Sequence, residues 1–369
     1  MVQSIYIAGT GQHAGKTFVS LGLVAALRER GLAVRYMKPV GQRTVHVDGV
    51  SVDEDVALIH RVFGMPGAVT AANPITVPRG FTQRFLLGGG NTDSLKEKIL
   101  AGFAETSDGA DVVVVEGTGH AGVGAVLGLS NATVAALLNS RTIVVIGGGI
   151  GQPIDEFAVN QALFEKESAP LLGVISNKVQ PSKMEECRST VSVWFGGAGI
   201  PVLGMVPMLP VLLEITLRQV VHEIEAYVLS GEEFLDRRLR KFIIGAAPAH
   251  RLLDEFTEGT LVITPGDRDD IILACISAEL SAEASDDAPH VSALCLTGGV
   301  RPQTNVLRII ERSRVPVIAS DDGTFNLATR IANLVAKILP RDHEKIRIAK
   351  ETVGELVDID RIAGGLSSA

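Results

Sequence analysis

The sequence predicts an α/β protein in which a parallel sheet carries helices on both faces and a second, smaller α/β domain follows. Short runs rich in Val and Ile alternate with longer stretches of helical periodicity, which is the pattern of a parallel sheet covered by helices. A glycine-rich segment follows the first apolar run, as at many strand-to-helix turns. The 369 residues also exceed the size at which a single core usually stops growing, so two domains are expected.

The composition favours a compact protein that binds small metabolites. Hydrophobic residues make up 46% of the chain and charged residues 21%, unlike a disordered or fibrous chain. A formal net charge of -8 argues against nucleic acid or an anionic membrane surface as a partner. Cys187, Cys275 and Cys295 are odd in number and widely spaced, so neither a disulfide framework nor a zinc site is indicated.

Nothing in the apolar stretches indicates a membrane span. The longest stretch, Ile200 to Leu213, is too short to cross a bilayer and contains three prolines. No Lys or Arg precedes the first apolar run, whereas a secretory signal would begin with positive charge. We therefore expect a cytoplasmic protein.

The first domain is expected to span residues 1–228. The helix from Thr17 to Glu29 is predicted by Val19, Leu23 and Leu27 on one face, and the helix from Asp53 to Val62 by its acidic start. Strands are expected at Ser4 to Ala8, Ala33 to Met37, Asp111 to Val115, Thr142 to Ile146, Leu172 to Asn177 and Pro201 to Val206.

A charged stretch, Leu229 to Phe256, interrupts this alternation and is interpreted as the passage into a second domain at residues 229–340. The alternation restarts there with strands at Thr260 to Thr264, Val291 to Leu296 and Val315 to Ala319, and helices at Asp269 to Leu280, Asn305 to Ser313 and Phe325 to Leu339. The turn "PGDRDD" fits a ligand turn as well as a capped helix start. Residues 341–369 form a helical tail with an apolar stripe, expected to pack on this domain or on a partner subunit.

The segment "IAGTGQHAGKT", Ile7 to Thr17, has the features of a phosphate-binding loop. Counted from Gly9 it is one residue longer than G-x-x-x-x-G-K-[ST], yet an apolar strand precedes it and a helix follows. Gly11 and Gly15 would let backbone N–H groups approach a phosphate, Lys16 would neutralise the β- and γ-phosphates, and Thr17 would ligate magnesium. The alternative is an ordinary glycine turn. With the loop, the fold class becomes a P-loop NTPase-type sheet.

Acidic and basic residues at other strand ends complete this expectation. Glu116 ends the apolar run "DVVVV", at the edge where a parallel sheet binds ligands, and Asp55 follows the second strand. Asp53 and Glu54 are better interpreted as helix-start electrostatics. Lys38 in "MKPVGQ" is either a second phosphate-binding cation or a solvated lysine.

Two histidines lie in glycine-rich loops that should face the γ-phosphate. "GTGQHAG" contains His13 and "GTGHAG" contains His120. Such a pair would bind an anionic substrate or move a proton near neutral pH. Alternatively, both are polar loop residues that hydrogen-bond the backbone.

Taken together and in order, the motifs resemble the dethiobiotin synthetase-like family of P-loop proteins. The motifs are "GTGQHAGKT", "KPV", the Asp55 region, "VEGTG", "GVISNKV" and "VLGMVPMLP". The resemblance implies ATP and Mg²⁺ as cofactors and a homodimer. It assigns phosphate to Lys16 and Lys38, magnesium to Thr17, Asp55 and Glu116, and the adenine edge to Asn177.

The sequence is more similar still to the N-terminal ATP-binding region of long phosphotransacetylases, in which a DRTGG domain follows. "LTGG", Leu296 to Gly299, stands where that domain's namesake motif is expected. No residues remain for an acetyl-transferring domain, so phosphotransacetylase activity is not predicted. Gly11, Gln12, His13 and Gln42 replace residues that dethiobiotin synthetases use for their own substrate, which makes dethiobiotin synthesis unexpected.

Three hypotheses remain. In the first, the protein binds Mg-ATP and has a regulatory or metabolite-sensing role, with an unidentified small metabolite as second ligand. In the second, it is an ATP-dependent ligase that activates a carboxylate or carbamate, as dethiobiotin and cobyrinate synthetases do; whether the protein is an enzyme is left open. The third is a scaffold with a vestigial loop, which the intact "GKT" and "VEG" make the weakest.

Overall fold

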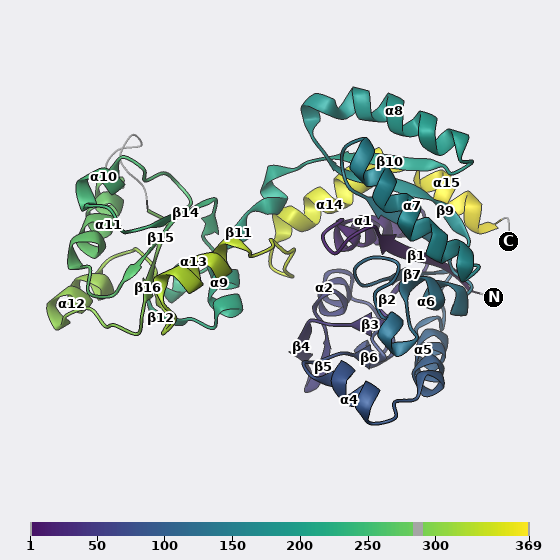
Figure 1. Ribbon diagram of the computed structural model, residues 1–369, viewed down its shortest axis with the longest axis horizontal. Coiled ribbons are helices and arrows are strands. Elements are labelled where there is room, and N and C mark those ends of the chain that lie inside the picture. The colour runs from purple at the N-terminus through teal and green to yellow at the C-terminus, as the bar shows by residue number, and fades with distance from the viewer. Residues whose placement is uncertain (1, 283–290, 368–369) are drawn as a thin grey trace. The chain divides into compact units, whose positions relative to one another are not determined.

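The computed structural model describes residues 2–282 and 291–367 and divides the chain into two compact units (Figure 1). The first, here called the P-loop unit, consists of Met1–Leu209 together with Ile338–Ala369. The second unit is Pro210–Lys337. These limits differ from the sequence-based division at 228/229 and 340/341, and the last residues rejoin the first unit instead of forming a separate tail.

The P-loop unit is built on a six-stranded sheet in the order β10-β9-β8-β1-β7-β2, and every neighbouring pair is parallel. Its carboxyl ends therefore meet at one edge, where Ile7 of β1 is in register with Glu116 of β7. This confirms the predicted fold class. The strands are β1 (Gln3–Gly9), β2 (Val34–Met37), β7 (Val112–Glu116), β8 (Arg141–Ile146), β9 (Leu171–Val179) and β10 (Val202–Pro207).

Helices cover both faces of this sheet, so the middle parts of its strands are mostly apolar. Tyr6, Val113 and Val144 belong to a buried core with residues of four helices, α5 (Thr92–Thr106), α6 (Asn131–Leu137), α7 (Gly151–Lys166) and α8 (Met184–Gly197). On the sheet's other side, α1 (Lys16–Glu29) packs with α14 (His343–Leu356), while α15 (Ile359–Ser367) lies near β10.

Between β2 and β7 the chain forms an additional subdomain of short elements. It contains the hairpin β4–β5, which leads directly into α2, and the parallel pair β3–β6. The elements are β3 (Val40–Gly41), β4 (Thr44–Val47), β5 (Val50–Asp53), α2 (Glu54–Phe63), α3 (Val69–Ala72), β6 (Ile75–Thr76) and α4 (Phe81–Leu87).

The second unit has a mixed five-stranded sheet in the order β12-β17-β16-β15-β14, with only the β12–β17 pair antiparallel. The two faces of this sheet have separate cores. Helices α10, α11 and α12 contribute to one core, and helices α9 and α13 contribute to the other. The strands are β11 (Ile215–Thr216), β12 (Tyr227–Ser230), β13 (Arg238–Leu239), β14 (Lys241–Ile244), β15 (Thr260–Pro265), β16 (Ala293–Thr297) and β17 (Val317–Ala319). The helices are α9 (Leu217–Ile224), α10 (Ala249–Leu253), α11 (Asp269–Ala282), α12 (Thr304–Arg312) and α13 (Thr324–Ala332).

The interpretation of Leu229 to Phe256 as a passage between domains was wrong. This stretch supplies β14 and the second half of β12 to the second sheet, and α10 to one of its cores. Its charges lie in ion pairs at the surface of the unit, where Arg240 contacts Glu214 and Glu258. Amphipathic α9, which precedes the stretch, buries Leu217 and Val220 in the second unit, so the boundary falls earlier.

Helix α14 belongs to the P-loop unit, where it packs against α1. Ile346, Ala349, Val353 and Val357 of the predicted stripe are buried, while Leu356 is partly exposed. Val357 also forms an isolated bridge to Gly204, which shields part of the sheet edge at β10. Within residues 2–282 and 291–367, no helix combines the length and apolar character needed to cross a membrane.

Candidate nucleotide site

The loop between β1 and α1 has the conformation that its glycines predict. Gly15 adopts φ 98°, a left-handed value that favours glycine, directly before α1 begins at Lys16. An ideal Cβ at Gly15 would lie 2.1 Å from Nδ2 of Asn177, so a side chain there would be obstructed as well as strained. Gly11 has open space around its Cα, and its carbonyl takes part in the site.

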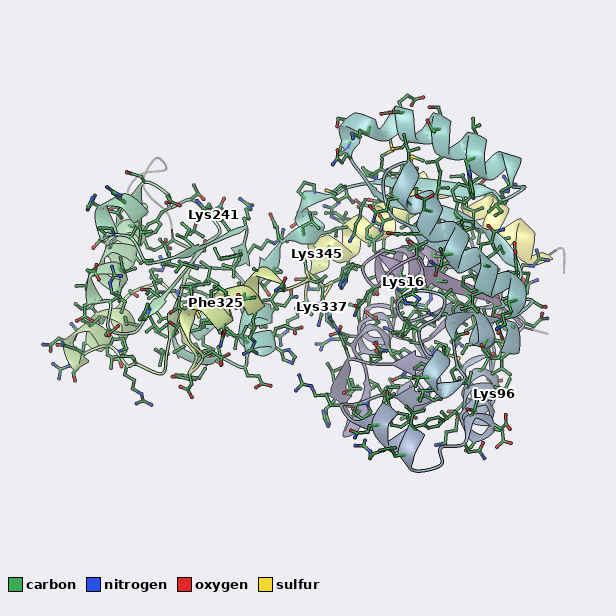
Figure 2. The ribbon with its side chains drawn as sticks, in the orientation of Figure 1. Lys16, Lys96, Lys241, Phe325, Lys337 and Lys345 are labelled. Atoms are coloured by element: carbon green, nitrogen blue, oxygen red, sulfur yellow. The ribbon has the colours of Figure 1, made fainter. Side chains whose placement is uncertain are left out.

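Lys16 turns back over this loop into the interior of the P-loop unit (Figure 2). Its ammonium donates to the carbonyl oxygens of Gly11 and Gly119, each at 3.1 Å. The side chain thus joins the loop after β1 to the loop after β7. Burial lowers the pKa of Lys16 to about 8, although the carboxylates of Glu116 and Asp55 oppose this shift.

Glu116 lies at the carboxyl end of β7, between β1 and β2, and is only 1% exposed. Its Oε1 accepts a hydrogen bond from the Thr17 hydroxyl at 2.8 Å, and its Oε2 accepts one from the Tyr36 hydroxyl at 2.9 Å. Burial, with repulsion from Asp55, raises the pKa of Glu116 to about 6. The two hydroxyls fix the carboxylate in one orientation beside the start of α1.

Lys38 is buried between two carboxylates. Its Nζ lies 2.9 Å from Oδ1 of Asp53 and also contacts Oδ2 of Asp55. Burial alone would lower the pKa of Lys38, but Asp55, Asp53 and Glu116 together hold it above its ordinary value. Burial alone would raise the pKa of Asp55. The charge of Lys38 has the larger effect, so the pKa of Asp55 lies below its ordinary value.

Asp53 has a larger role than the predicted helix start. Its side chain does cap α2 by accepting the Asp55 N–H at 3.0 Å, as expected for an acidic residue at this position. It also accepts the N–H groups of Gln42 and Arg43 and pairs with Lys38. The sequence offered no sign of the ion pair, because it depends on how the β4–β5 hairpin folds back toward β2.

The two predicted histidines are both exposed. The His13 carbonyl accepts a hydrogen bond from Lys178 Nζ at 2.7 Å, and Nδ1 of His120 accepts the Gly122 N–H at 3.2 Å. Partial burial and the nearby charges of Lys178, Arg43 and Lys16 lower the pKa of His13. In the described part of the chain, no hydrogen bond joins the two imidazoles.

Asn177, at the end of β9, is buried against the loop. Its Nδ2 donates to the Ala14 carbonyl at 2.8 Å, and its Oδ1 accepts the N–H of Lys178. Two further amides absent from the sequence-based prediction hold the loops. Asn131 bonds the backbone of Thr118 and the carbonyl of His120, and Asn160 accepts the Ala121 N–H.

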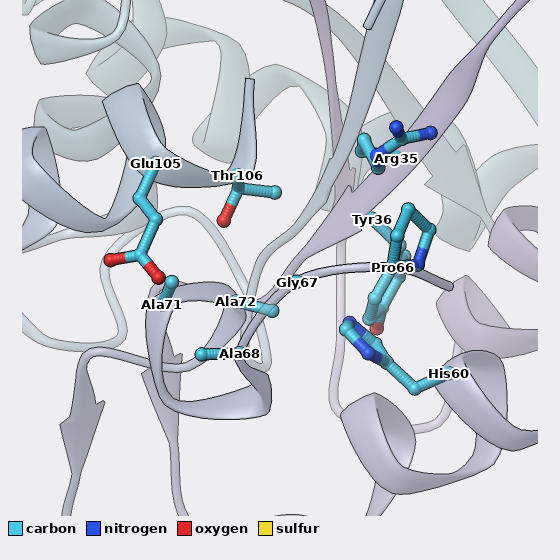
Figure 3. Close-up of a pocket in the computed structure, with 10 residues that line it drawn as sticks. All are labelled: Arg35, Tyr36, His60, Pro66, Gly67, Ala68, Ala71, Ala72, Glu105 and Thr106. Atoms are coloured by element: carbon cyan, nitrogen blue, oxygen red, sulfur yellow. The ribbon is translucent and has the colours of Figure 1, made fainter. Parts of the chain in front are cut away.

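A small cavity lies beside Tyr36, and its lining does not include Lys16, Asp55 or Glu116 (Figure 3). Its lining includes the side chains of Tyr36, His60 and Thr106, and its volume is about 10 Å³. That volume accommodates roughly one water molecule. The Thr106 hydroxyl is buried without a hydrogen-bond partner, so a water there is the expected occupant.

The donors available for a cation at the sheet edge are oxygens only. Thr17, Asp55 and Glu116 converge there, since the Thr17 hydroxyl donates to Glu116 and the charge of Asp55 acts on that carboxylate. Across the described residues, no group of three or more His, Cys, Asp or Glu side chains is arranged to hold a metal unaided. This partial, all-oxygen set fits Mg²⁺, which usually takes one or two carboxylates and completes its shell with water and phosphate oxygens.

A parallel sheet with a Gly-Lys-Thr loop, a buried lysine over that loop and a carboxylate on the neighbouring strand defines a P-loop protein of the nucleotide-binding class. Residues 3–216 match the family model described as "AAA domain", and residues 219–334 match the one described as "DRTGG domain". The first match covers more than half of the chain, so the chain belongs to this family of dethiobiotin synthetase-like P-loop proteins.

The chain is also homologous to the N-terminal half of phosphate acetyltransferases. It is 27% identical over 379 residues to the phosphate acetyltransferase of Synechocystis sp., covering 100% of this chain and 52% of the relative. The Pseudomonas putida enzyme is 29% identical over 372 residues, covering 97% and 51%. The chain thus spans about half the length of these relatives.

A more distant likeness exists to a solved structure, cobyrinic acid a,c-diamide synthase from Mycobacterium smegmatis with bound ADP and magnesium. It covers 57% of this chain and 88% of that chain, with 16% identity and a TM-score of 0.35. A likeness at this level says nothing about ligands.

Proposed function

We propose that the P-loop unit binds Mg-ATP and that the chain acts as a nucleotide-dependent regulator or metabolite sensor. The observation that carries the proposal is the convergence of two buried ammonium groups and three oxygen donors at one sheet edge. Lys16 closes over the loop where phosphates would bind, and Lys38 lies beside Asp55. Buried cations beside open backbone N–H groups of a helix start are suited to phosphate.

In this proposal Thr17, Asp55 and Glu116 hold Mg²⁺, which neutralises charge on the phosphate oxygens. Lys16 exchanges its contacts with Gly11 and Gly119 for phosphate oxygens. Because the lysine now bonds two backbone carbonyls, nucleotide binding would also release the contact between the loops after β1 and β7. That release is a physical means by which the nucleotide state could be transmitted.

The sensing role is supported by what the loop lacks. Gly11, Gln12, His13 and Gln42 replace the residues that the resemblance assigns to the substrate of dethiobiotin synthetases. The two family matches account for the chain with a P-loop unit and a DRTGG unit, and neither is described as a transferase. We therefore propose that these 369 residues alone do not transfer acetyl groups and that they respond to an unidentified small metabolite. From the family resemblance we also propose that they form a homodimer.

The second candidate function is an ATP-dependent ligase that activates a carboxylate or carbamate. It is favoured by Lys38, because a regulator needs only to bind nucleotide, whereas phosphoryl transfer benefits from a further cation near the transferred group. His13 and His120 would then be the residues available to bind the anionic substrate or to move a proton.

Calorimetric titration with Mg-ATP, together with an assay for ADP, tests both functions. Wild-type protein and Lys16→Ala are compared alone and with pools of small carboxylic and amino acids. Binding with slow or absent turnover supports the regulator, and turnover that rises with one pool and disappears in Lys16→Ala supports the ligase. Absence of binding would exclude both. An acetyl-CoA assay with phosphate checks the expected lack of acetyl transfer.

A further inference from the structure

The carboxylates of Asp53 and Asp55, which both contact Lys38, differ in their exposure and in their hydrogen bonds. The Asp53 side chain is 1% exposed, while that of Asp55 is 20% exposed. Asp53 accepts three backbone N–H groups in addition to the lysine, which is close to the limit for one carboxylate. Asp55 contacts Lys38 through its Oδ2 atom. Asp53 is therefore fixed by the backbone, and Asp55 is the member of the pair that can move.

Asn73 ties Lys38 and Asp53 together through their backbones. The Asn73 side chain is buried, donates to the carbonyl of Lys38 at 2.8 Å, and accepts the N–H of Asp53 at 2.8 Å. Gly41 lies close by, since an ideal Cβ there would be 2.6 Å from the Asp53 Cβ. The pairing of Lys38 with Asp53 is thus built into the packing of β2, β3 and β5.

Asp55 has two competing partners once a magnesium ion is considered. Magnesium requires short, nearly octahedral oxygen contacts, so the Asp55 oxygen that contacts Lys38 cannot keep that contact unchanged when it turns to the ion. If Asp55 were the sole partner of Lys38, its transfer to the ion would leave a buried ammonium unpaired, which is strongly unfavourable. Asp53 removes that obstacle.

We propose that Asp53 is a positioning residue that keeps Lys38 paired and in place while Asp55 passes from Lys38 to the magnesium ion. This inference rests on the proposed function, because it presupposes that Mg-ATP binds. The Lys38–Asp55 contact is then the nucleotide-free arrangement of the site. In the loaded site Lys38 remains on Asp53 with its other N–H groups available to phosphate.

The test is a series of calorimetric titrations with ATP at increasing Mg²⁺ concentrations. The quantity compared is the Mg²⁺ concentration at which half of the Mg²⁺-dependent increase in ATP affinity is reached. Asp53→Asn keeps the shape and one acceptor oxygen but removes the charge, so Lys38 depends on Asp55 alone. We expect the half-maximal Mg²⁺ concentration to rise about tenfold, as for coupled neighbouring charges. In a Lys38→Gln background the same substitution should change it by less than about twofold.

The background variant separates positioning from a merely structural role. An equal effect of Asp53→Asn in both backgrounds would show that the residue acts as a helix cap, and no effect in either would also overturn the inference. Wild-type protein that binds no ATP would instead refute the proposed function itself.

A second variant keeps the inference testable if Asp53→Asn does not fold. Asp55→Asn removes one negative charge while Asp53 retains Lys38, so ATP affinity measured in EDTA should increase about threefold. If Asp55 were what places Lys38, affinity in EDTA would fall or stay the same, and Asp53 would not have the proposed role.

Discussion

Gly22 of α1 lies directly against Val353 of α14, so closely that an ideal Cβ at Gly22 would be 2.3 Å from the Val353 Cβ and 2.5 Å from the Ala349 carbonyl. The backbone of α1 at Gly22 therefore lies in contact with the Val353 side chain of α14, although the two helices come from opposite ends of the sequence. The helix that starts at the phosphate loop is backed by the C-terminal helix, which makes the last residues part of the P-loop unit.

Gly22→Ala should consequently destabilise the protein although alanine favours helices. The added methyl group must displace Val353 or α14, and overpacking of a tight core typically costs about 1–3 kcal/mol. The measurement is the free energy of unfolding in urea. Gly354→Ala is the matched control, because it lies in α14 with nothing within 4 Å of its ideal Cβ. It should be neutral or stabilising by up to about 1 kcal/mol, and equal effects of the two changes would contradict the packing argument.

The affinity for Mg-ATP should fall as the pH rises through about 8. Burial lowers the pKa of Lys16 to about 8 in the free protein, and a bound phosphate would raise it by favouring the ammonium form. Below pH 8 the lysine is charged in both states and affinity is level. Above pH 8 Lys16 is mostly neutral in the free protein and must take up a proton when the nucleotide binds. The affinity therefore drops by up to tenfold per pH unit.

Two substitutions identify the group responsible for this pH dependence. Lys16→Ala should reduce affinity strongly and leave its value independent of pH between about 7.5 and 9.5. Lys96→Ala, on α5, should leave both affinity and profile as in the wild type. A pH-dependent loss that persists in Lys16→Ala would assign the proton to another group.

Tyr36→Phe should lower the free energy of unfolding. Burial and the charge of Glu116 hold the pKa of Tyr36 well above its usual value, so its hydroxyl stays protonated and donates to Glu116. Without it the buried carboxylate loses one partner, at a cost of about 1–3 kcal/mol in the free energy of unfolding. Tyr227→Phe is the control, since that partly exposed hydroxyl has only a 3.5 Å contact with Asp321. Comparable losses in the two variants would rule out a special role for Tyr36.

The sequence was sufficient to predict the sheet and the residues at its edge. Apolar runs located all six strands of the main parallel sheet within one or two residues, because such a sheet is buried on both faces. Lys16 and Thr17 followed from the Gly-Lys-Thr motif after the first strand, and Glu116 from the rule that parallel strands present their carboxyl ends together.

Other features depended on tertiary contacts that local patterns do not contain. Asp53 looks like a helix cap in the sequence and is one, but its pairing with Lys38 arises from a hairpin that returns to β2. The strand β14 was missed because its apolar run, Phe242 to Ile244, is only three residues long and follows the charged sequence "DRRLRK". Charge alone was therefore a poor guide to the domain boundary.

Asn177→Ala distinguishes base recognition from support of the loop. The resemblance assigns Asn177 to the adenine edge, yet its Nδ2 and Oδ1 are bonded to the Ala14 carbonyl and the Lys178 N–H. If Asn177 mainly supports the loop, the variant should lose affinity for ATP and GTP by the same factor, about tenfold, because both nucleotides use the same phosphate contacts. If Asn177 contacts adenine, the loss should fall on ATP and the ratio of the two affinities should shift.

Lys178→Met is the control for loop support, because it removes the bond to the His13 carbonyl on the same loop. It should reproduce the uniform loss of affinity that loop support predicts. Calorimetry with both nucleotides decides, and we expect an unchanged ratio, since an amide with both polar atoms bonded within the protein must break those bonds before it can contact a base.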